Sequence, residues 1–140
     1  MLEEDVILSK VSIIKNCLRT IQKVTEGNPK KLEDLLIQDV FVLNIQRSVQ
    51  ASIDIAQVVI SKKDLSLSSS YKDTFYILTK EKIISPALCK KMQNMVGFRN
   101  IAVHDYQKLN LDILKTILKK HLPDFEEFYS KILRWMKMKK

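Results

Sequence analysis

Glycine and proline are scarce in this 140-residue sequence, which has only two glycines and three prolines. Proteins built from sheets need turn residues between many short strands, so the scarcity argues against a sandwich or a barrel. No stretch alternates apolar and polar residues convincingly, as a half-buried strand would. The composition therefore predicts an all-α fold with long helices and few loops.

The sequence also lacks the motifs that are typical of several classes of protein. Cys17 and Cys89 show no CxxC spacing and no neighbouring ligand cluster, which indicates reduced, buried thiols. No apolar run reaches the length of a membrane span, and the acidic start, MLEED, is unlike a signal peptide. No HExxH pair or carboxylate cluster predicts a metal site, and no glycine-rich loop predicts a phosphate cradle. We therefore expect a cytoplasmic protein that uses no metal and no cofactor.

The charge balance is strongly basic. Lysine and arginine number 24 against 16 acidic residues, which gives a net charge of +8. Such a balance indicates a polyanionic partner, either RNA or an acidic protein. The densest basic cluster is the C-terminal tail of Lys137, Lys139 and Lys140. This tail could bind such a partner, or it could simply be a solvated chain end.

Apolar residues recur every three or four positions along most of the chain, as in amphipathic helices. Ser70 with Asp73 resembles a capping box, and Ser85 before Pro86 is a typical helix start. The expected helices cover residues 3–26, 32 or 34 to 61, 71–80, 86 to between 104 and 107, and 110 onward with a kink or restart at Pro123. Residues 62–70 form a loop. The sequence thus predicts one domain, residues 1–140, folded as an up-and-down bundle of four to five helices.

Residues 99–106, RNIAVHDY, contain one of the two histidines. His104 can transfer protons near neutral pH, and Arg99 is a permanent cation suited to a phosphate. If the helix continues through Tyr106, Arg99 and Tyr106 lie on nearly the same face, whereas Arg99 and His104 lie about 140° apart. This divergence predicts that the helix loosens near Val103, or that each residue works with a partner from another helix or another chain.

RNA cleavage without metal needs few groups. One group removes the proton of the 2′-hydroxyl, one protonates the leaving 5′-oxygen, and a cation stabilises the transition state. His104 could perform either transfer, Arg99 could hold the phosphate with two hydrogen bonds, and Asn100 could orient the imidazole or donate to phosphate. Tyr106 could stack on a base. Spacing alone nevertheless favours a structural interpretation, because histidine commonly interacts with the helix dipole at a C-terminus.

Other polar residues have weaker signals. Asp105 could orient the imidazole or accept from Arg99. The second helix carries a polar stripe made by Asn44, Arg47, Ala51 and Asp54. The stripe could form a wall of an RNA cleft with Arg47 as a second phosphate ligand, but a solvated face with an internal ion pair is the favoured interpretation. His121 has no adjacent carboxylate and is predicted to be a capping or surface residue.

The Arg-x4-His-x-Tyr spacing within RNIAVHDY, late in a small helical chain, resembles the HepT toxins of the HEPN superfamily. The segments NIQRSVQASIDIAQVVI and SYKDTFYILTKEKIIS resemble the same group, so the likeness spans most of the chain. It implies a metal-independent endoribonuclease toxin whose two copies face a common cleft. It also implies an MntA-like nucleotidyltransferase antitoxin that neutralises the toxin by transferring AMP to Tyr106, within a homodimer or a larger hetero-oligomer.

On this hypothesis Arg99 and His104 are catalytic, and Asn100, Arg47 and Asp105 support them. One histidine and one arginine are few catalytic groups, however, so a second hypothesis is a non-catalytic helical module. Such a module would help a partner nucleotidyltransferase to bind nucleotide or substrate. A third hypothesis is a protein that only dimerises, in which changes to residues 99–106 would affect stability alone.

Overall fold

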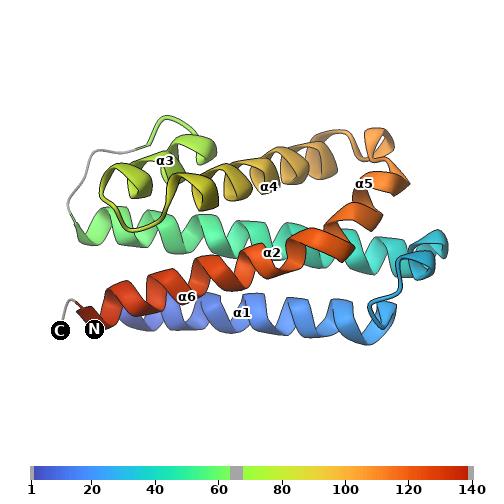
Figure 1. Cartoon of the computed structure of the whole chain (residues 1–140), viewed down its shortest axis with the longest axis horizontal. Helices are drawn as coiled ribbons and strands as arrows, with labels where there is room; N and C mark the ends of the chain where they lie inside the picture. The colour runs from blue at the N-terminus through green and yellow to red at the C-terminus, as the bar shows by residue number, and fades with distance from the viewer. Residues whose placement is uncertain (1, 64–67, 139–140) are drawn as a thin grey trace.

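The computed structural model describes residues 2–63 and 68–138, and within these ranges the chain forms helices and no strand, as the composition predicts (Figure 1). Residues 64–67 of the predicted loop and Lys139 and Lys140 of the basic tail lie outside the described residues. The elements are α1 (Leu2–Thr25), η1 (Pro29–Glu33), α2 (Leu35–Lys62), α3 (Tyr71–Lys80), α4 (Pro86–His104), η2 (Tyr106–Lys108), α5 (Leu111–Thr116), η3 (Ile117–His121) and α6 (Leu122–Met138).

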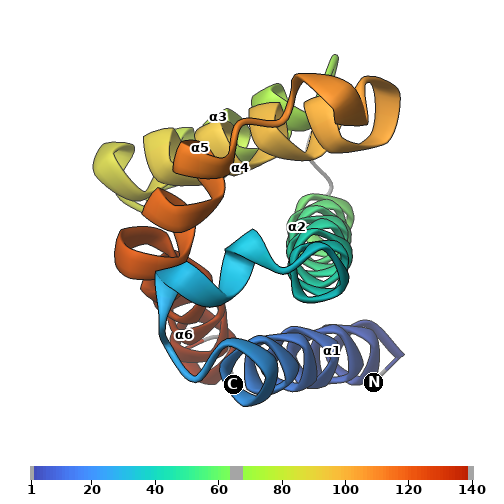
Figure 2. The same cartoon turned by 90° about the vertical axis from the view of Figure 1, so that its right-hand side faces the viewer.

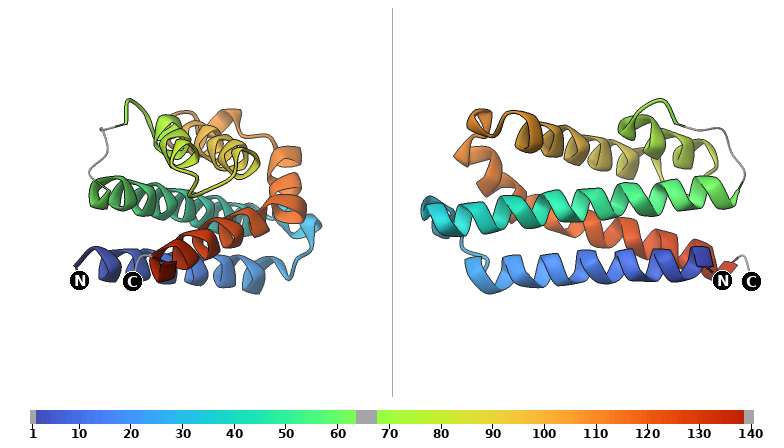
Figure 3. Two further views of the ribbon diagram at one scale, coloured as in Figure 1. Left: turned by 60° about the vertical axis from the view of Figure 1, so that its left-hand side comes forward. Right: turned by 180° about the vertical axis from the view of Figure 1, so that it is seen from behind.

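The long helices run alternately up and down. Helix α1 leads away from the chain start, α2 returns, α4 leads away again, and α5 to α6 return, so that both chain ends lie at the same end of the bundle (Figure 1). Viewed along the bundle, α1, α2, α4 and α6 surround one core (Figure 2). Helix α2 lies between α1 on one side and α3 with α4 on the other, and it contacts all of them (Figure 3). The predicted antiparallel bundle is therefore confirmed.

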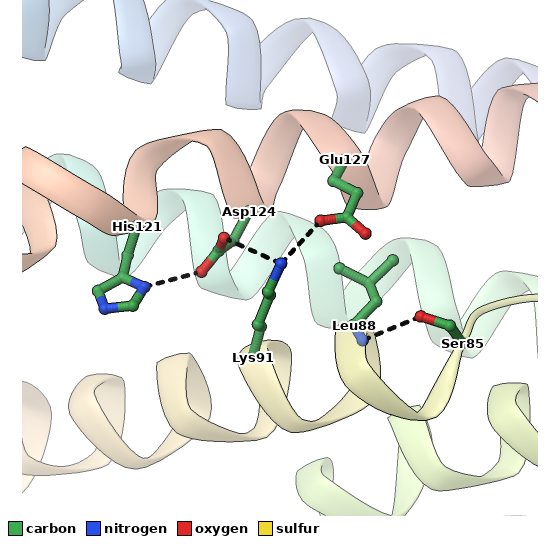
Figure 4. Close-up of polar contacts among 6 residues, drawn as sticks. All are labelled: Ser85, Leu88, Lys91, His121, Asp124 and Glu127. Atoms are coloured by element: carbon green, nitrogen blue, oxygen red, sulfur yellow. Dashed lines mark hydrogen bonds and ion pairs between the residues drawn. The ribbon is translucent and has the colours of Figure 1, made fainter.

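Local capping explains why the helices begin where the sequence predicts. The Ser70 hydroxyl accepts from the Asp73 amide at 3.0 Å, and α3 covers the predicted residues 71–80. The Ser85 hydroxyl accepts from the Leu88 amide at 3.1 Å, with Pro86 at the first helical position of α4 (Figure 4). Because a cap joins residues only two or three positions apart, its position can be predicted without tertiary structure.

The predicted break near Pro123 takes the form of a wide turn. Residues Ile117–His121 form a π-helical segment that joins α5 to α6 without interrupting the helical path. Proline has no backbone N–H, and its ring clashes with the carbonyl four residues earlier, so a wider turn relieves the clash and bends the chain. The prediction of a kink is confirmed, and α5, η3 and α6 together make one bent arm.

The core consists of apolar side chains from every α-helix. Phe75 and Phe128 meet edge to face with ring centroids 5.5 Å apart, and both are fully buried. Cys17 and Cys89 are buried free thiols, as predicted. Among the described residues, none of the helices combines the length and apolar character that crossing a bilayer requires.

Candidate functional site

The RNIAVHDY segment changes conformation in its middle. Helix α4 ends at His104, and Asp105 follows with φ −156° and ψ 63°, a backbone conformation outside the helical region that terminates the helix. Tyr106 then opens the separate turn η2. The end of α4 thus lies within the predicted range of residues 104 to 107, and the supposed continuation through Tyr106 does not occur. The segment divides into a helical part and a turn that can contact different partners.

Arg99 points from α4 toward α2 and α3. Its Nη2 donates to Gln50 Oε1 at 2.9 Å, and its Nη1 donates to Asn100 Oδ1 at 3.3 Å. The guanidinium carbon lies 5.4 Å from the centroid of the Tyr71 ring, a cation–π distance. These contacts fix the direction of a side chain that would otherwise move freely on a helix surface.

The contact with Gln50 continues into a chain of polar groups. Gln50 Nε2 donates to Asp54 Oδ1 at 2.9 Å, and Asp54 Oδ2 pairs with Lys10 Nζ of α1 at 3.0 Å. The orientation of the Gln50 amide follows from its two partners, because the carbonyl must accept from Arg99 and the amino group must donate to Asp54. Sequence reasoning did not identify Gln50, since only the packing of α4 on α2 brings it to Arg99.

Tyr106 contacts the start of α2. Its hydroxyl donates to Asp39 Oδ1 at 2.5 Å, although the two residues lie 67 positions apart in the sequence. Partial burial, together with the hydrogen bond to Asp39 and the charge of that carboxylate, raises the pKa of Tyr106 from 10.0 to about 12. Asp39 was also absent from the residues singled out by sequence, because no local pattern joins it to the motif.

Helix α2 thus holds both parts of the motif on one face. Asp39 and Gln50 are eleven residues apart, which places them within about 20° around the helix axis and about 16 Å apart along it. Arg99 and Tyr106 are consequently anchored at separate points of one surface. The guanidinium of Arg99, which is suited to binding phosphate, is therefore separated along α2 from the hydroxyl of Tyr106.

His104 is exposed at the end of α4, and its ring has no hydrogen-bonding or ionic partner within residues 2–63 and 68–138. Asp105 pairs instead with Lys108 at 3.3 Å, so its predicted contact with the imidazole or with Arg99 is not formed. Asn100 is exposed and accepts from Arg99. The structure therefore presents an exposed imidazole at the end of α4, five residues after an arginine that is held against α2 and α3.

The predicted polar stripe of α2 is only partly solvated. Asn44 and Ala51 are buried, so the interpretation of the whole stripe as a solvated face is wrong. Asp54 pairs with Lys10 on a neighbouring helix, and not within α2. Arg47 is exposed and lines a groove between α1 and α2, with a cavity volume of about 490 Å³, together with these residues.

His121 has a carboxylate partner after all. Its Nδ1 lies 3.1 Å from Asp124 Oδ2, three residues along the chain (Figure 4). The prediction that it lacks such a neighbour considered only adjacent residues, whereas spacing of three places two side chains on one helical face.

No group of three or more potential metal ligands occurs in the part of the chain that the structure describes.

Replacing Asp39 by Asn should lower the pKa of Tyr106 part of the way toward 10. The amide removes the negative charge that disfavours a phenolate, while the burial of the ring remains. Ultraviolet titration between pH 8 and 13 would measure this change, with Tyr106→Phe as the reference that isolates its signal from the other tyrosines. An unchanged titration curve would show that Asp39 does not influence the hydroxyl.

Known proteins resemble this chain in sequence and in fold. The mRNA nuclease HepT of Shewanella oneidensis is 41% identical over 124 residues, which span 89% of this chain and 93% of that protein. A solved structure of the tri-AMPylated Shewanella oneidensis HEPN toxin in complex with the MNT antitoxin superposes with a TM-score of 0.88 at 40% identity, covering 93% of this chain and 98% of the toxin.

A more distant likeness concerns the fold alone. The cytosolic protein YutE of Bacillus subtilis, of unknown function, superposes with a TM-score of 0.85 at 15% identity and covers 97% of this chain. A family model described as ribonuclease HepT-like matches residues 14–132. With this match over most of its length and a relative of 41% identity, the chain belongs to the ribonuclease HepT-like family.

Proposed function

We propose that this chain is a metal-independent endoribonuclease and the toxin of a toxin–antitoxin pair, folded as one HEPN-like domain and acting in the cytoplasm. The observation that carries the proposal is a fixed guanidinium, Arg99, on the same short segment as an exposed imidazole, His104. The activity given in the name of the Shewanella relative supports it. The net charge of +8 supports it also, because it favours a polyanionic substrate.

The chemistry follows from the groups available. The 2′-oxygen of the RNA attacks the adjacent phosphorus, the bond to the 5′-oxygen breaks, and a cyclic phosphate and a 5′-hydroxyl remain. His104 makes one of the two proton transfers, either from the attacking 2′-oxygen or to the leaving 5′-oxygen, and solvent water accepts or supplies the other proton. Arg99 stabilises the additional negative charge on phosphate with directed hydrogen bonds. Asn100, which follows Arg99 in the chain, and Arg47, three residues before Gln50 on α2, support phosphate binding in this proposal.

The active form in this proposal is a homodimer. Residues five apart on one helix point about 140° away from each other, so Arg99 and His104 of one copy are poorly placed to act on one phosphate. Leu36 and Leu43 of α2 and Val103 of α4 are exposed apolar side chains on the elements that hold the motif. Covering them with a second copy would bring two motifs into one cleft.

Tyr106 is the proposed site of neutralisation by an MntA-like nucleotidyltransferase antitoxin, which can assemble with the dimer into a larger hetero-oligomer. The complex of the AMPylated Shewanella toxin with its antitoxin supports this assignment. The Tyr106 oxygen attacks the α-phosphorus of ATP, the bond to pyrophosphate breaks, and the phenolic proton passes to Asp39 Oδ1. A phenol with a raised pKa needs such an acceptor, because little of it is ionised near neutral pH.

The direct test is incubation of purified protein with RNA in the presence of a metal chelator. Cleavage by the parent protein, lost in His104→Ala, would support the proposal. Binding of RNA or of the nucleotidyltransferase without any cleavage would instead support the non-catalytic module. Intact folding of the variant, measured by circular dichroism and molecular mass in solution, makes the comparison valid.

Gln50→Leu should lower kcat/KM for RNA cleavage by about tenfold. The change removes the acceptor that directs Arg99, and one hydrogen bond to a charged group contributes about 1.5 kcal/mol. Gln50→Glu, which retains an acceptor, should keep most of the activity.

Gln57→Leu provides the matched control, because Gln57 is an exposed glutamine farther along α2. Equal activity of Gln50→Leu and Gln57→Leu would mean that Gln50 does not position Arg99. Initial rates over a range of RNA concentrations would separate an effect on kcat from one on KM.

A further inference from the structure

A hollow lies on the side of α4 that faces α5 and α6, separate from Arg99 and the α2 surface. Its volume is about 350 Å³, which is within the range of small-molecule sites. Met95 and Phe98 of α4 form one wall, and Ile113 and Ile117 of the bent arm form another. Ile113 is 45% exposed, so apolar surface remains uncovered at the hollow.

A charged cluster closes the other end. Asp124 is 95% buried, because its exposed fraction is 5%, and its carboxylate contacts His121 Nδ1 at 3.1 Å and Lys91 Nζ at 4.0 Å. Lys91 also pairs with Glu127 at 3.2 Å, and the three side chains converge between α4 and α6 (Figure 4). The π-helical turn brings His121 to this position, and such turns often occur at functional sites.

The cluster determines which atom of His121 can bind a ligand. A carboxylate only accepts hydrogen bonds, so Nδ1 carries the proton that it donates to Asp124. In the neutral ring, Nε2 is then a hydrogen-bond acceptor. A ligand that donates an N–H would satisfy this nitrogen.

The charged residues that line the hollow favour a positively charged ligand. Asp112 and Asp124 contribute two carboxylates against the single ammonium of Lys91. Within the described ranges the Asp112 carboxylate has no ion-pair or hydrogen-bonding partner, whereas Asp124 has two cationic or donor neighbours. The hollow is thus acidic in a chain whose net charge is +8, which opposes RNA phosphate and favours an ammonium group.

We propose that this hollow is a binding site for a small organic amine with an apolar, ring-sized body. The body packs against Met95, Phe98 and Ile117, the ammonium pairs with Asp112, and one N–H donates to His121 Nε2. The site is independent of the RNA-cleaving function proposed above, because Arg99 and His104 are not part of its lining.

Isothermal titration calorimetry of the full chain with tryptamine tests this proposal. Tryptamine should bind with saturation at millimolar or lower concentration, and indole-3-acetate, which has the same ring and a negative charge, should not. Asp112→Asn should weaken tryptamine binding at least tenfold. Ile113→Trp, which fills the hollow, should abolish it.

Asp5→Asn is the matched control, since Asp5 is an exposed aspartate on α1 outside the hollow and its replacement should leave the affinity unchanged. Circular dichroism would verify that each variant is folded. The proposal is overturned if tryptamine does not bind, if indole-3-acetate binds equally well, or if Asp112→Asn binds tryptamine like the parent.

Discussion

His104→Ala is expected to reduce the rate of RNA cleavage by about 10²–10⁴-fold, the usual contribution of a positioned general acid or base. The side chain is exposed and makes no hydrogen bond or ion pair with the described residues, so its removal should cost little stability. Single-turnover cleavage of a defined RNA measures the chemical step. Gln107→Ala is the control, because Gln107 is also exposed and lies in the turn η2 that follows His104. Its replacement should leave the cleavage rate unchanged.

Two variants of Arg99 distinguish the effect of its positive charge from the effect of its hydrogen-bonding geometry. Arg99→Ala should reduce cleavage by about 10²–10³-fold, as for the loss of a group that stabilises the transition state. Arg99→Lys retains the positive charge but loses the planar guanidinium group, so its cleavage rate should lie between those of Arg99→Ala and the parent protein. If His104→Ala cleaves RNA as fast as the parent, the acid–base role is assigned to the wrong residue.

The second large effect concerns modification. Tyr106→Phe should abolish the addition of AMP when the protein is incubated with its cognate nucleotidyltransferase and ATP, because the attacking oxygen is missing. The ring is retained, so RNA cleavage should remain and should no longer be inhibited by the partner. Intact-protein mass spectrometry measures the added AMP groups, and an RNA cleavage assay measures the release from inhibition.

Two further variants make this test specific. Tyr76→Phe removes the hydroxyl of another half-exposed tyrosine and should leave AMP addition unchanged. Asp39→Asn should slow AMP addition without affecting RNA cleavage, because it removes only the proposed proton acceptor of Tyr106. Undiminished AMP addition to Tyr106→Phe would place the modification on a different residue.

The sequence by itself determined the features that depend on neighbours in the chain. Helix starts at Ser70 and Ser85 were predicted correctly because a cap joins residues three apart. The 3.6-residue periodicity marked the buried faces of α1 and α2, and short connections predicted antiparallel neighbours. The motif residues Arg99, His104 and Tyr106 were also visible as a local pattern.

Only the tertiary structure decided what those residues contact. Gln50 lies 49 positions from Arg99, and Asp39 lies 67 positions from Tyr106, so the packing of α4 and η2 on α2 creates both pairs. The same holds for Lys91 and Asp124, which meet across α4 and α6 at the hollow. Periodicity records which side of a helix is buried, but it carries no information on which other helix covers that side, because many pairings bury the same apolar surface equally well.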